Sequence, residues 1–299
     1  GREYLHQIRR AAQDAHFLHW FPGAGEMASY PLQGYVWEVS GQVVGNLTLI
    51  ASFVKDQWRY LIVNVAVHPD YRQRGIARQL TLKGLAHIRE HGASSAWLQV
   101  RDDNFSAINL YTSLGFKERA RRTTWISDNI TPDPDVYQYT SIARRQDKEW
   151  NMHNAWLQRD YPESVAWHLP LSMRKFKPSL INKLDSFFSD LPVSHWTSYM
   201  DGHPIGFASI EPTRQSTDAI WLAVAPNHKE PAIKSLLKHM HQIAPAYRSL
   251  AINYPAETAD ETFIASGFTR QNTLIWMEVP FKSNTPSILQ KLIDRIVTF

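Results

Sequence analysis

A basic loop that contains a glycine follows an apolar, strand-like stretch in the first third of the chain. The stretch covers residues 61–67 and ends at His68-Pro69, and the loop carries Arg72, Arg74 and Gly75 before a helical pattern begins. The first turn of a helix has backbone N–H groups without partners and the positive end of the helix dipole, so it can hold a phosphate group. The loop is therefore a candidate phosphate site, and the alternative is a basic loop that binds nothing.

A second segment that could do chemistry lies downstream and contains Tyr111. This residue shares one helical stripe with apolar residues at positions 107, 110 and 114. A phenol can protonate a leaving group, and such a proton transfer typically raises a rate by about 10²–10⁴. A ring on an apolar stripe can equally well fill the core. On the residues alone, both interpretations of Tyr111 stay open.

Together the two segments resemble the GNAT superfamily of N-acetyltransferases. The loop reads Arg72-x-x-Gly75-x-Ala77, like the pyrophosphate-binding pattern R/Q-x-x-G-x-G/A of that family, and residues 104–116 are similar to its signature N-x-x-A-x-x-L-Y-x-x-x-G-F. The resemblance covers about residues 34–127 with intact motifs, and the second half of the chain only in outline. It implies acetyl-CoA as co-substrate, a primary amine of a small molecule or peptide as acceptor, and no metal.

The resemblance also implies a role for each residue of these motifs. Tyr111 takes the place of the general acid, whose phenol protonates the departing CoA thiolate, and Asn104 takes the place of a residue that contacts the CoA arm. The other implied cofactor-binding positions are the strand residues that pair with the pantetheine arm and the loop residues that hold the pyrophosphate, namely Val65, Ala66, Val67, Arg72, Gln73, Arg74, Gly75, Ile76 and Ala77.

One position departs from some members of the family. They carry a glutamate in Leu-Glu-Val-Arg before the asparagine, and this chain has Gln99 there. A glutamine cannot take the proton of an ammonium group. The general base is therefore expected to be a water held by Asn64, Gln99 or backbone carbonyls, whereas Glu26 and Glu38 are not favoured.

The two halves of the chain carry the same landmarks in the same order. Each half has a strand, a glycine turn and a returning strand, then a short strand that ends in proline, a helical pattern, and a Gly-Phe pair before a strand with tryptophan. The matching residues are Gly45 and Gly206, Pro69 and Pro226, Gly115 and Gly267, and Trp125 and Trp276. This order predicts two diverged copies of one α/β domain.

The predicted fold class is α/β, of the mixed α+β type, with two tandem GNAT-like domains. Each domain is expected to be a mostly antiparallel mixed sheet flanked by helices. Domain one spans residues 1–130, a linker rich in proline and aspartate follows, and domain two spans residues 136–281. Residues 2–18 have a helical pattern, so domain one is expected to lack its first strand. Residues 285–298 are expected to form an amphipathic helix.

The second copy has lost the residues to which the resemblance assigns chemistry. With the copies aligned on the proline, loop positions 72, 74, 75 and 77 correspond to Lys229, Pro231, Ala232 and Lys234. A proline has no N–H to offer a phosphate, and Phe263 stands where the first copy has Tyr111. Domain two is therefore expected to be a degenerate copy that serves a structural or substrate-binding purpose.

Composition excludes several other classes. Aromatic residues make up 12% of the 299, too many for a disordered chain, and the absence of cysteine excludes disulfide scaffolds, thiol catalysis and Cys-ligated metals. The net charge is +4 and the cations are scattered, so neither nucleic acid nor a membrane is an expected partner. No apolar leader or membrane-spanning run is present, and a reducing, cytoplasmic compartment is expected.

The chain also matches two other motifs, and two rival functions stay open beside the acetyltransferase. His87-x-x-Glu90-His91 has a zinc-protease order and Gly23-x-Gly25-x-x-Ala28 imitates a dinucleotide fingerprint, but neither has the structural context that its chemistry needs. A non-catalytic acetyl-CoA-binding or sensor protein is one rival to the acetyltransferase, and a protein-modifying acetylase is the other. The oligomeric state stays open.

Overall fold

The computed structural model describes residues 33–127 and 139–281, apart from residues 168, 170, 215 and 246. The chain forms two compact units. Among the described residues, unit 1 comprises residues 33–119 and 276–281, and unit 2 comprises residues 120–127 and 139–275 without the four positions just named. The helix and absent strand expected near the N-terminus, and the helix expected over residues 285–298, lie outside the described residues.

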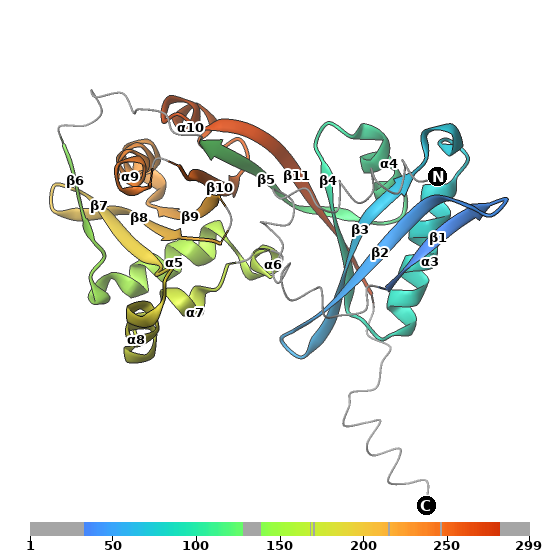
Figure 1. Ribbon diagram of the computed structural model, residues 1–299, viewed down its shortest axis with the longest axis horizontal. Helices are drawn as coiled ribbons and strands as arrows, with labels where there is room; N and C mark the ends of the chain where they lie inside the picture. Colours follow the sequence, from blue (N-terminus) through green and yellow to red (C-terminus); the bar gives the residue numbers. More distant parts are fainter. Residues whose placement is uncertain are drawn as a thin grey trace, which may run out of the picture. The chain divides into compact units, whose positions relative to one another are not determined.

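Unit 1 is built on a sheet of long strands with a helical crossover (Figure 1). Strands β1 and β2 form a hairpin through Ser40 and Gly41, whose φ values of 50° and 78° suit a tight two-residue turn. Helix α3 packs against the first three strands and leads to a parallel strand. The elements in chain order are β1 (Gln33–Val39), β2 (Gln42–Val54), β3 (Gln57–Val67), η2 (Pro69–Tyr71), α3 (Ile76–Glu90), β4 (Ser95–Arg101) and α4 (Phe105–Ser113).

Unit 2 repeats this order with additional short helices. In Figure 1, α9 lies on one side of its strands and α5 on the other. The elements are β6 (Thr140–Arg144), η3 (Asp147–Glu149), α5 (Trp150–Asp160), α6 (Glu163–Ala166), α7 (Met173–Phe176), α8 (Leu180–Phe188), β7 (Ser194–Met200), β8 (His203–Glu211), β9 (Thr217–Val224), η4 (Pro226–His228), α9 (Lys229–Ile243), β10 (Ser249–Pro255) and α10 (Asp260–Ala265).

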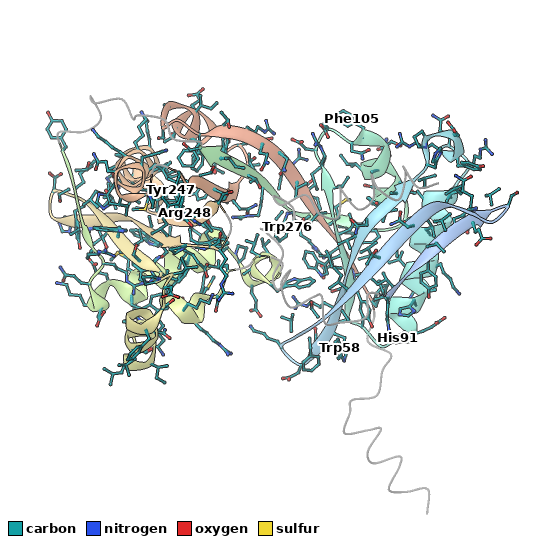
Figure 2. The ribbon with its side chains drawn as sticks, in the orientation of Figure 1. Trp58, His91, Phe105, Tyr247, Arg248 and Trp276 are labelled. Carbon is teal, nitrogen blue, oxygen red and sulfur yellow. The ribbon has the colours of Figure 1, made fainter. Side chains whose placement is uncertain are left out.

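Two further strands, β5 (Lys117–Ser127) and β11 (Thr269–Pro280), each contribute to both units. In hydrogen-bonding order, β11 is the neighbour of β4, and β5 is the neighbour of β10. Trp125 on β5 is buried in the core of unit 2, where its ring stacks on Phe263 with centroids 5.1 Å apart. Trp276 on β11 is 1% exposed and belongs to unit 1 (Figure 2). The last strand of each sequence half is thus exchanged.

The predicted fold class is confirmed, because both units are mixed sheets with flanking helices and the same element order. The predicted sequence landmarks take equivalent conformations: the hairpin turn at Asp201 and Gly202 repeats the left-handed turn of unit 1, and Gly115 and Gly267 have φ values of 91° and 83°. The compact units do not end at the predicted linker, since the strand exchange moves residues 120–127 into unit 2 and residues 276–281 into unit 1. No helix in the described part of the chain is long and apolar enough to cross a membrane.

Candidate active site

The candidate site in unit 1 starts where two parallel strands separate. The pairing of β3 with β4 ends at Ile62 and Leu98, so the following residues of both strands diverge. Asn64 has a φ of 54° and lies at an irregularity of the β2–β3 register, where Asn46 Nδ2 donates to its carbonyl oxygen over 2.8 Å. A bulge of this kind turns a strand and changes the direction of its side chains. It lies directly before the predicted pantetheine-binding stretch.

The predicted phosphate loop has the backbone conformation that such a site needs. After the 3₁₀ turn η2, Gln73 and Gly75 adopt positive φ values of 61° and 77°. Gly75 is the N-cap of α3 and has no side chain to occupy the free amides. None of the described residues accepts a hydrogen bond from the N–H groups of residues 73–77. These amides and the helix dipole are available to an anion.

The two arginines of the loop contact the protein's own backbone. Arg72 Nε donates to the carbonyl oxygen of Val67 over 3.1 Å, and Arg74 Nη2 donates to that of Asp70 over 2.9 Å. The Arg74 guanidinium also lies over the ring of Tyr71, 5.0 Å from its centroid. Both side chains are exposed, and they brace the loop while they keep further N–H groups for a ligand.

Two adjoining cavities connect the loop with the diverging strands. The larger one has a volume of about 610 Å³, and the smaller one, between β3 and β4, has about 260 Å³. Both are lined by Val65, Asn104, Ala107 and Tyr111, so they meet along β3 and α4. We call them together the groove. The larger cavity includes all predicted cofactor residues except Arg74, namely Val65, Ala66, Val67, Arg72, Gln73, Gly75, Ile76, Ala77 and Asn104.

Some residues that line the larger cavity were not predicted from the sequence, although the position of one of them in its helix is informative. Arg78 lines the larger cavity, and its Nη1 donates to Ser113 Oγ over 2.8 Å. A cation in the first turn of a helix opposes the helix dipole, so its presence there could have pointed to a bound anion. Tyr71, Ser106 and Leu110 also line the cavity, and no sequence pattern distinguishes them.

Tyr111 combines the two interpretations that its sequence position left open. Its side chain is only 7% exposed and packs edge-on against Phe116 with centroids 5.9 Å apart. The residue nevertheless lines both cavities, and no described residue forms a hydrogen bond with its hydroxyl. Burial raises the pKa of the Tyr111 phenol to about 12, so the hydroxyl stays protonated at neutral pH. The ring is a core element that also lines the groove.

Asn104 has a structural role besides the predicted contact with the CoA arm. Its Oδ1 accepts a hydrogen bond from Ala107 N over 3.1 Å and so caps α4. The cap uses the oxygen of the amide and leaves its Nδ2 group for a ligand in the groove. Capping also fixes the start of α4, the helix that carries Tyr111.

The residues that could hold a water as general base line the smaller cavity. Asn64 and Gln99 both line it, and the described lining of the two cavities contains no carboxylate. Glu38 lies on β1 away from both cavities, and Glu26 is outside the described residues. The arrangement offers amide groups and backbone carbonyls that can hold a water.

The corresponding loop of unit 2 has a different backbone. Gly45 lies against Ile76 and Leu80, and Gly206 lies in the same way against Ala232 and Leu236. Ala232 therefore takes the place of Ile76, and Pro231 that of Gly75, because the connection after the proline is one residue shorter. Helix α9 begins already at Lys229, so the residues that form an open loop in unit 1 are helical here. The alignment on the proline was one residue off at this helix.

The diverging strands of unit 2 are filled by its own side chains. Pairing of β9 with β10 ends at Ile220 and Ile252. Beyond this point, Tyr161 donates through its hydroxyl to the carbonyl oxygen of Asn253 over 3.0 Å, and Arg159 donates to that of Val224. The fully buried Arg122 donates to both the side chain and the carbonyl oxygen of Asn253. Phe263, at the position of Tyr111, is entirely buried in the core.

The histidines of the zinc-like motif have other partners. Tyr35 Oη lies 2.9 Å from His87 Nδ1, and the His87 ring stacks on His91 with centroids 4.0 Å apart. Within the described residues, no group of three or more His, Cys, Asp or Glu side chains is arranged to hold a metal ion. The dinucleotide-like segment lies outside those residues.

Comparison with known proteins places these features in one family. Residues 3–116 match the model of the acetyltransferase (GNAT) family. An N-alpha-acetyltransferase of Sulfurisphaera tokodaii is 32% identical over 124 residues, which are 38% of this chain and 72% of that protein. The ribosomal protein bS18 alanine N-acetyltransferase of Escherichia coli K12 is 39% identical over 64 residues, 21% of this chain and 43% of that enzyme.

The solved structures agree in fold. A GCN5-related N-acetyltransferase from Sphaerobacter thermophilus superposes with a TM-score of 0.52 at 12% identity, over 80% of this chain and 78% of that one. Because the superposition covers 80% of this chain, it includes parts of both units. At this identity the likeness concerns the fold alone. The match to the Escherichia coli enzyme spans less than half of that enzyme's length.

Proposed function

Because this chain belongs to the acetyltransferase (GNAT) family, we propose that its first unit transfers an acetyl group from acetyl-CoA to a primary amine. One observation carries the proposal. The groove brings together the free amides of residues 73–77, the strand edge of residues 65–67 and the side chain of Tyr111. A phosphate site, a strand edge for an amide-bearing arm and a buried acid are the three elements that acyl transfer from a CoA thioester requires.

Acetyl-CoA binding follows from the backbone of the groove. The pyrophosphate occupies the start of α3, where Gln73, Gly75 and the helix dipole supply positive potential. The pantetheine arm carries amide groups and lies along β3, whose free edge begins after Ile62. Asn104 Nδ2 contacts the arm from α4. Backbone N–H groups near Val67 polarise the thioester carbonyl.

The chemical step is a direct attack of the neutral amine on the carbonyl carbon. A C–N bond forms and the C–S bond breaks, so negative charge develops on the sulfur. Tyr111 donates its proton to that thiolate as the C–S bond breaks, and its raised pKa of about 12 keeps the phenol protonated until then. The ammonium proton leaves through a water held by Asn64 or Gln99, since no described carboxylate lines the groove.

A second candidate acceptor class is the α-amine of a peptide or protein. It is favoured by the names of two relatives, an N-alpha-acetyltransferase and an alanine N-acetyltransferase that acts on ribosomal protein bS18. A small-molecule amine stays the first acceptor class to test, and the described lining of the groove has no carboxylate to hold a cationic amine of either class.

The test is release of free CoA, detected by a thiol reagent, with a panel of small amines, aminoglycosides and short peptides that have free N-termini. Turnover with a small amine supports the first proposal, and turnover with peptides alone supports the second. Acetyl-CoA binding by calorimetry without any CoA release would identify a sensor instead of an enzyme. Absence of acetyl-CoA binding would contradict all three functions.

The second unit is proposed to bind no acetyl-CoA. The support is its helical loop, Pro231 at the place of Gly75, and the side chains of Arg159 and Tyr161 on the strand carbonyls. We infer that this unit has a structural or substrate-binding role.

A further inference from the structure

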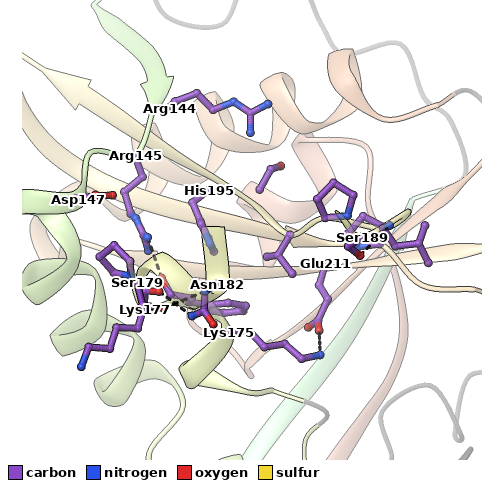
Figure 3. A pocket seen from close by; sticks show the side chains of 17 residues that line it. Arg144, Arg145, Asp147, Lys175, Lys177, Ser179, Asn182, Ser189, His195 and Glu211 are labelled. Atoms are coloured by element: carbon purple, nitrogen blue, oxygen red, sulfur yellow. Dashed lines mark hydrogen bonds and ion pairs between the residues drawn. The ribbon is translucent and has the colours of Figure 1, made fainter. Parts of the chain in front are cut away.

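Unit 2 contains a cavity that has no part in the proposed acetyl transfer. It has a volume of about 420 Å³ and lies between the end of β6, the start of β7 and the segments around α7 and α8 (Figure 3). We call it the Arg145 pocket, after the half-buried cation in its wall. A volume of this order matches a small metabolite, and preformed cavities of this size are the usual form of ligand sites.

The charged side chains around the Arg145 pocket are unevenly balanced. Its lining includes four cations, Arg144, Arg145, Lys175 and Lys177, but only two carboxylates, Asp147 and Glu211. Lys175 Nζ lies 2.8 Å from Glu211 Oε1, and this carboxylate also accepts from Trp221 Nε1 over 3.1 Å. Glu211 is therefore already paired with Lys175 and Trp221, and the lining keeps an excess of positive charge.

Arg145 is the best placed of these cations. Its guanidinium is held by two neutral acceptors, His153 Nδ1 at 2.9 Å and the carbonyl oxygen of Phe176 at 2.8 Å. It also lies over the Trp150 ring, 5.2 Å from the centroid. Its Nε is buried and has no hydrogen-bond partner among the described residues. The guanidinium is therefore held in one orientation, and some of its N–H groups have no acceptor among the described residues.

Other groups of the wall add to the same potential. Ser179 is the N-cap of α8, and the positive end of this helix faces the pocket lining. Asn182 Nδ2 donates to the carbonyl oxygens of Arg174 and Lys177 over 2.7 and 2.8 Å, which fixes the loop between α7 and α8. Figure 3 shows Arg145, His195 and Asn182 around one space.

Part of the remaining lining is apolar and stiff. Leu191 and Val193 contribute apolar surface, and prolines at positions 178, 192 and 212 restrict the backbone of the loops. Burial lowers the pKa of His195 to about 3, so its ring is neutral at physiological pH. A ligand here meets apolar walls and a cationic end.

We propose that the Arg145 pocket binds a small organic anion with an apolar body and one carboxylate or phosphate group. The anionic group lies at Arg145 and Lys177, and the body lies against Leu191 and Val193. This site is separate from the groove of unit 1 and does not depend on the proposed acetyl transfer.

The test uses the full chain and three probes of one shape: benzoate, phenyl phosphate and benzamide. Binding is measured by calorimetry and located by amide chemical shifts in NMR spectra. We expect benzoate or phenyl phosphate to bind with a Kd of about 1 mM or tighter, with shifts over residues 175–179 and 191–195. The neutral benzamide is expected to bind about tenfold more weakly, since it forms no charge-assisted hydrogen bond. Preference for benzoate identifies a carboxylate ligand, and preference for phenyl phosphate identifies a phosphate ligand.

Variants decide whether the cations are responsible. Lys177→Gln should weaken binding about threefold to tenfold, and Arg145→Gln should abolish it. Lys148→Gln removes the same charge from an exposed residue of the same unit outside the lining, and should change nothing. If Arg145→Gln does not fold, the Lys177→Gln and Lys148→Gln pair still decides. Equal binding of benzamide, equal effects of both lysine variants, shifts confined to the unit 1 groove, or no binding would each overturn the proposal.

Discussion

At the scale of single residues, Tyr111 carries the most direct prediction. Tyr111→Phe keeps the buried ring and removes only the hydroxyl. If the phenol protonates the thiolate, kcat should fall about 10²–10³-fold while acetyl-CoA affinity changes little, because the lost interaction forms mainly in the transition state. The melting temperature should be nearly unchanged. Steady-state kinetics with an amine from the acceptor screen, under conditions where chemistry limits the rate, measures this.

A matched control exists in the same unit. Tyr60 is equally buried, at 7% exposure, and lines neither cavity of the groove. Tyr60→Phe should therefore leave kcat within about twofold of the parent, as expected for a change outside the reacting groups. A normal kcat for Tyr111→Phe, or an equal loss in both variants, would remove Tyr111 from the mechanism.

The buried histidines of unit 2 predict a loss of stability in acid. Burial lowers the pKa of His153 well below its usual value, and lowers that of His195 to about 3. In the unfolded chain both titrate near pH 6.5. As pH falls below about 6.5, the unfolded state takes up protons that the folded state does not, so stability falls by up to about 1.4 kcal/mol per pH unit for each histidine.

His153→Gln tests this assignment. An amide oxygen can still accept the hydrogen bond of Arg145 Nη1, but it does not titrate. The variant should lose less stability than the parent between about pH 6.5 and pH 5, as measured by urea unfolding at several pH values. The exposed His203, replaced in the same way, should leave the slope of the parent. An unchanged slope in His153→Gln would contradict the prediction.

At the scale of elements, the loop before α3 differs from its counterpart before α9. Gly75→Glu should abolish acetyl-CoA binding, because it places a carboxylate at the phosphate site and strains a φ of 77°. Gly75→Ala has the same strain without the charge, and an added Cβ meets no atom within 4 Å. It should weaken binding by about 5- to 30-fold, equivalent to the 1–2 kcal/mol cost of a left-handed residue.

The equivalent change in unit 2 is Pro231→Glu, at the third position of α9. It should leave acetyl-CoA affinity unchanged, since a carboxylate near a helix N-terminus is well tolerated and no cofactor is expected there. Calorimetry should give one acetyl-CoA per chain for the parent and for Pro231→Glu. Two equivalent sites, or a loss of affinity in Pro231→Glu, would show that the second unit also binds the cofactor.

At the scale of the whole molecule, the exchanged strands make the sequence halves interdependent. A fragment that ends at residue 130 lacks β11, which supplies the buried Trp276 and pairs beside β4. An unpaired β4 would expose its hydrogen-bonding edge. We therefore expect fragment 1–130 to be unstable or aggregated alone, and to fold when fragment 131–299 is expressed with it. Circular dichroism and gel filtration measure both states, and a stable, monomeric fragment 1–130 would contradict the exchange.

The site and the fold class were predictable from sequence to the extent that they depend on local chemistry. Glycine adopts a left-handed backbone at the lowest cost, so Gly41, Gly75 and Gly115 indicated where the chain turns, although Ser40, Asn64 and Gln73 share that conformation. The phosphate loop, the capped helix at Asn104 and the position of Tyr111 follow from neighbouring residues in the same way. The chemical roles of the residues that line the groove stay predictions.

Only the tertiary structure decided the features that join distant parts of the chain. The exchange of β5 and β11 depends on the strand with which each of them pairs. The sequence around Trp125 and Trp276 is similar, so it does not predict that pairing. The filling of the second strand gap by Arg122, Arg159 and Tyr161 brings together residues that no pattern links. The Arg145 pocket likewise arises where the ends of three strands, β6, β7 and β8, meet the segments around α7 and α8. Short-range periodicity determines elements and turns, whereas burial and charge at such junctions are set by packing between residues far apart in the chain.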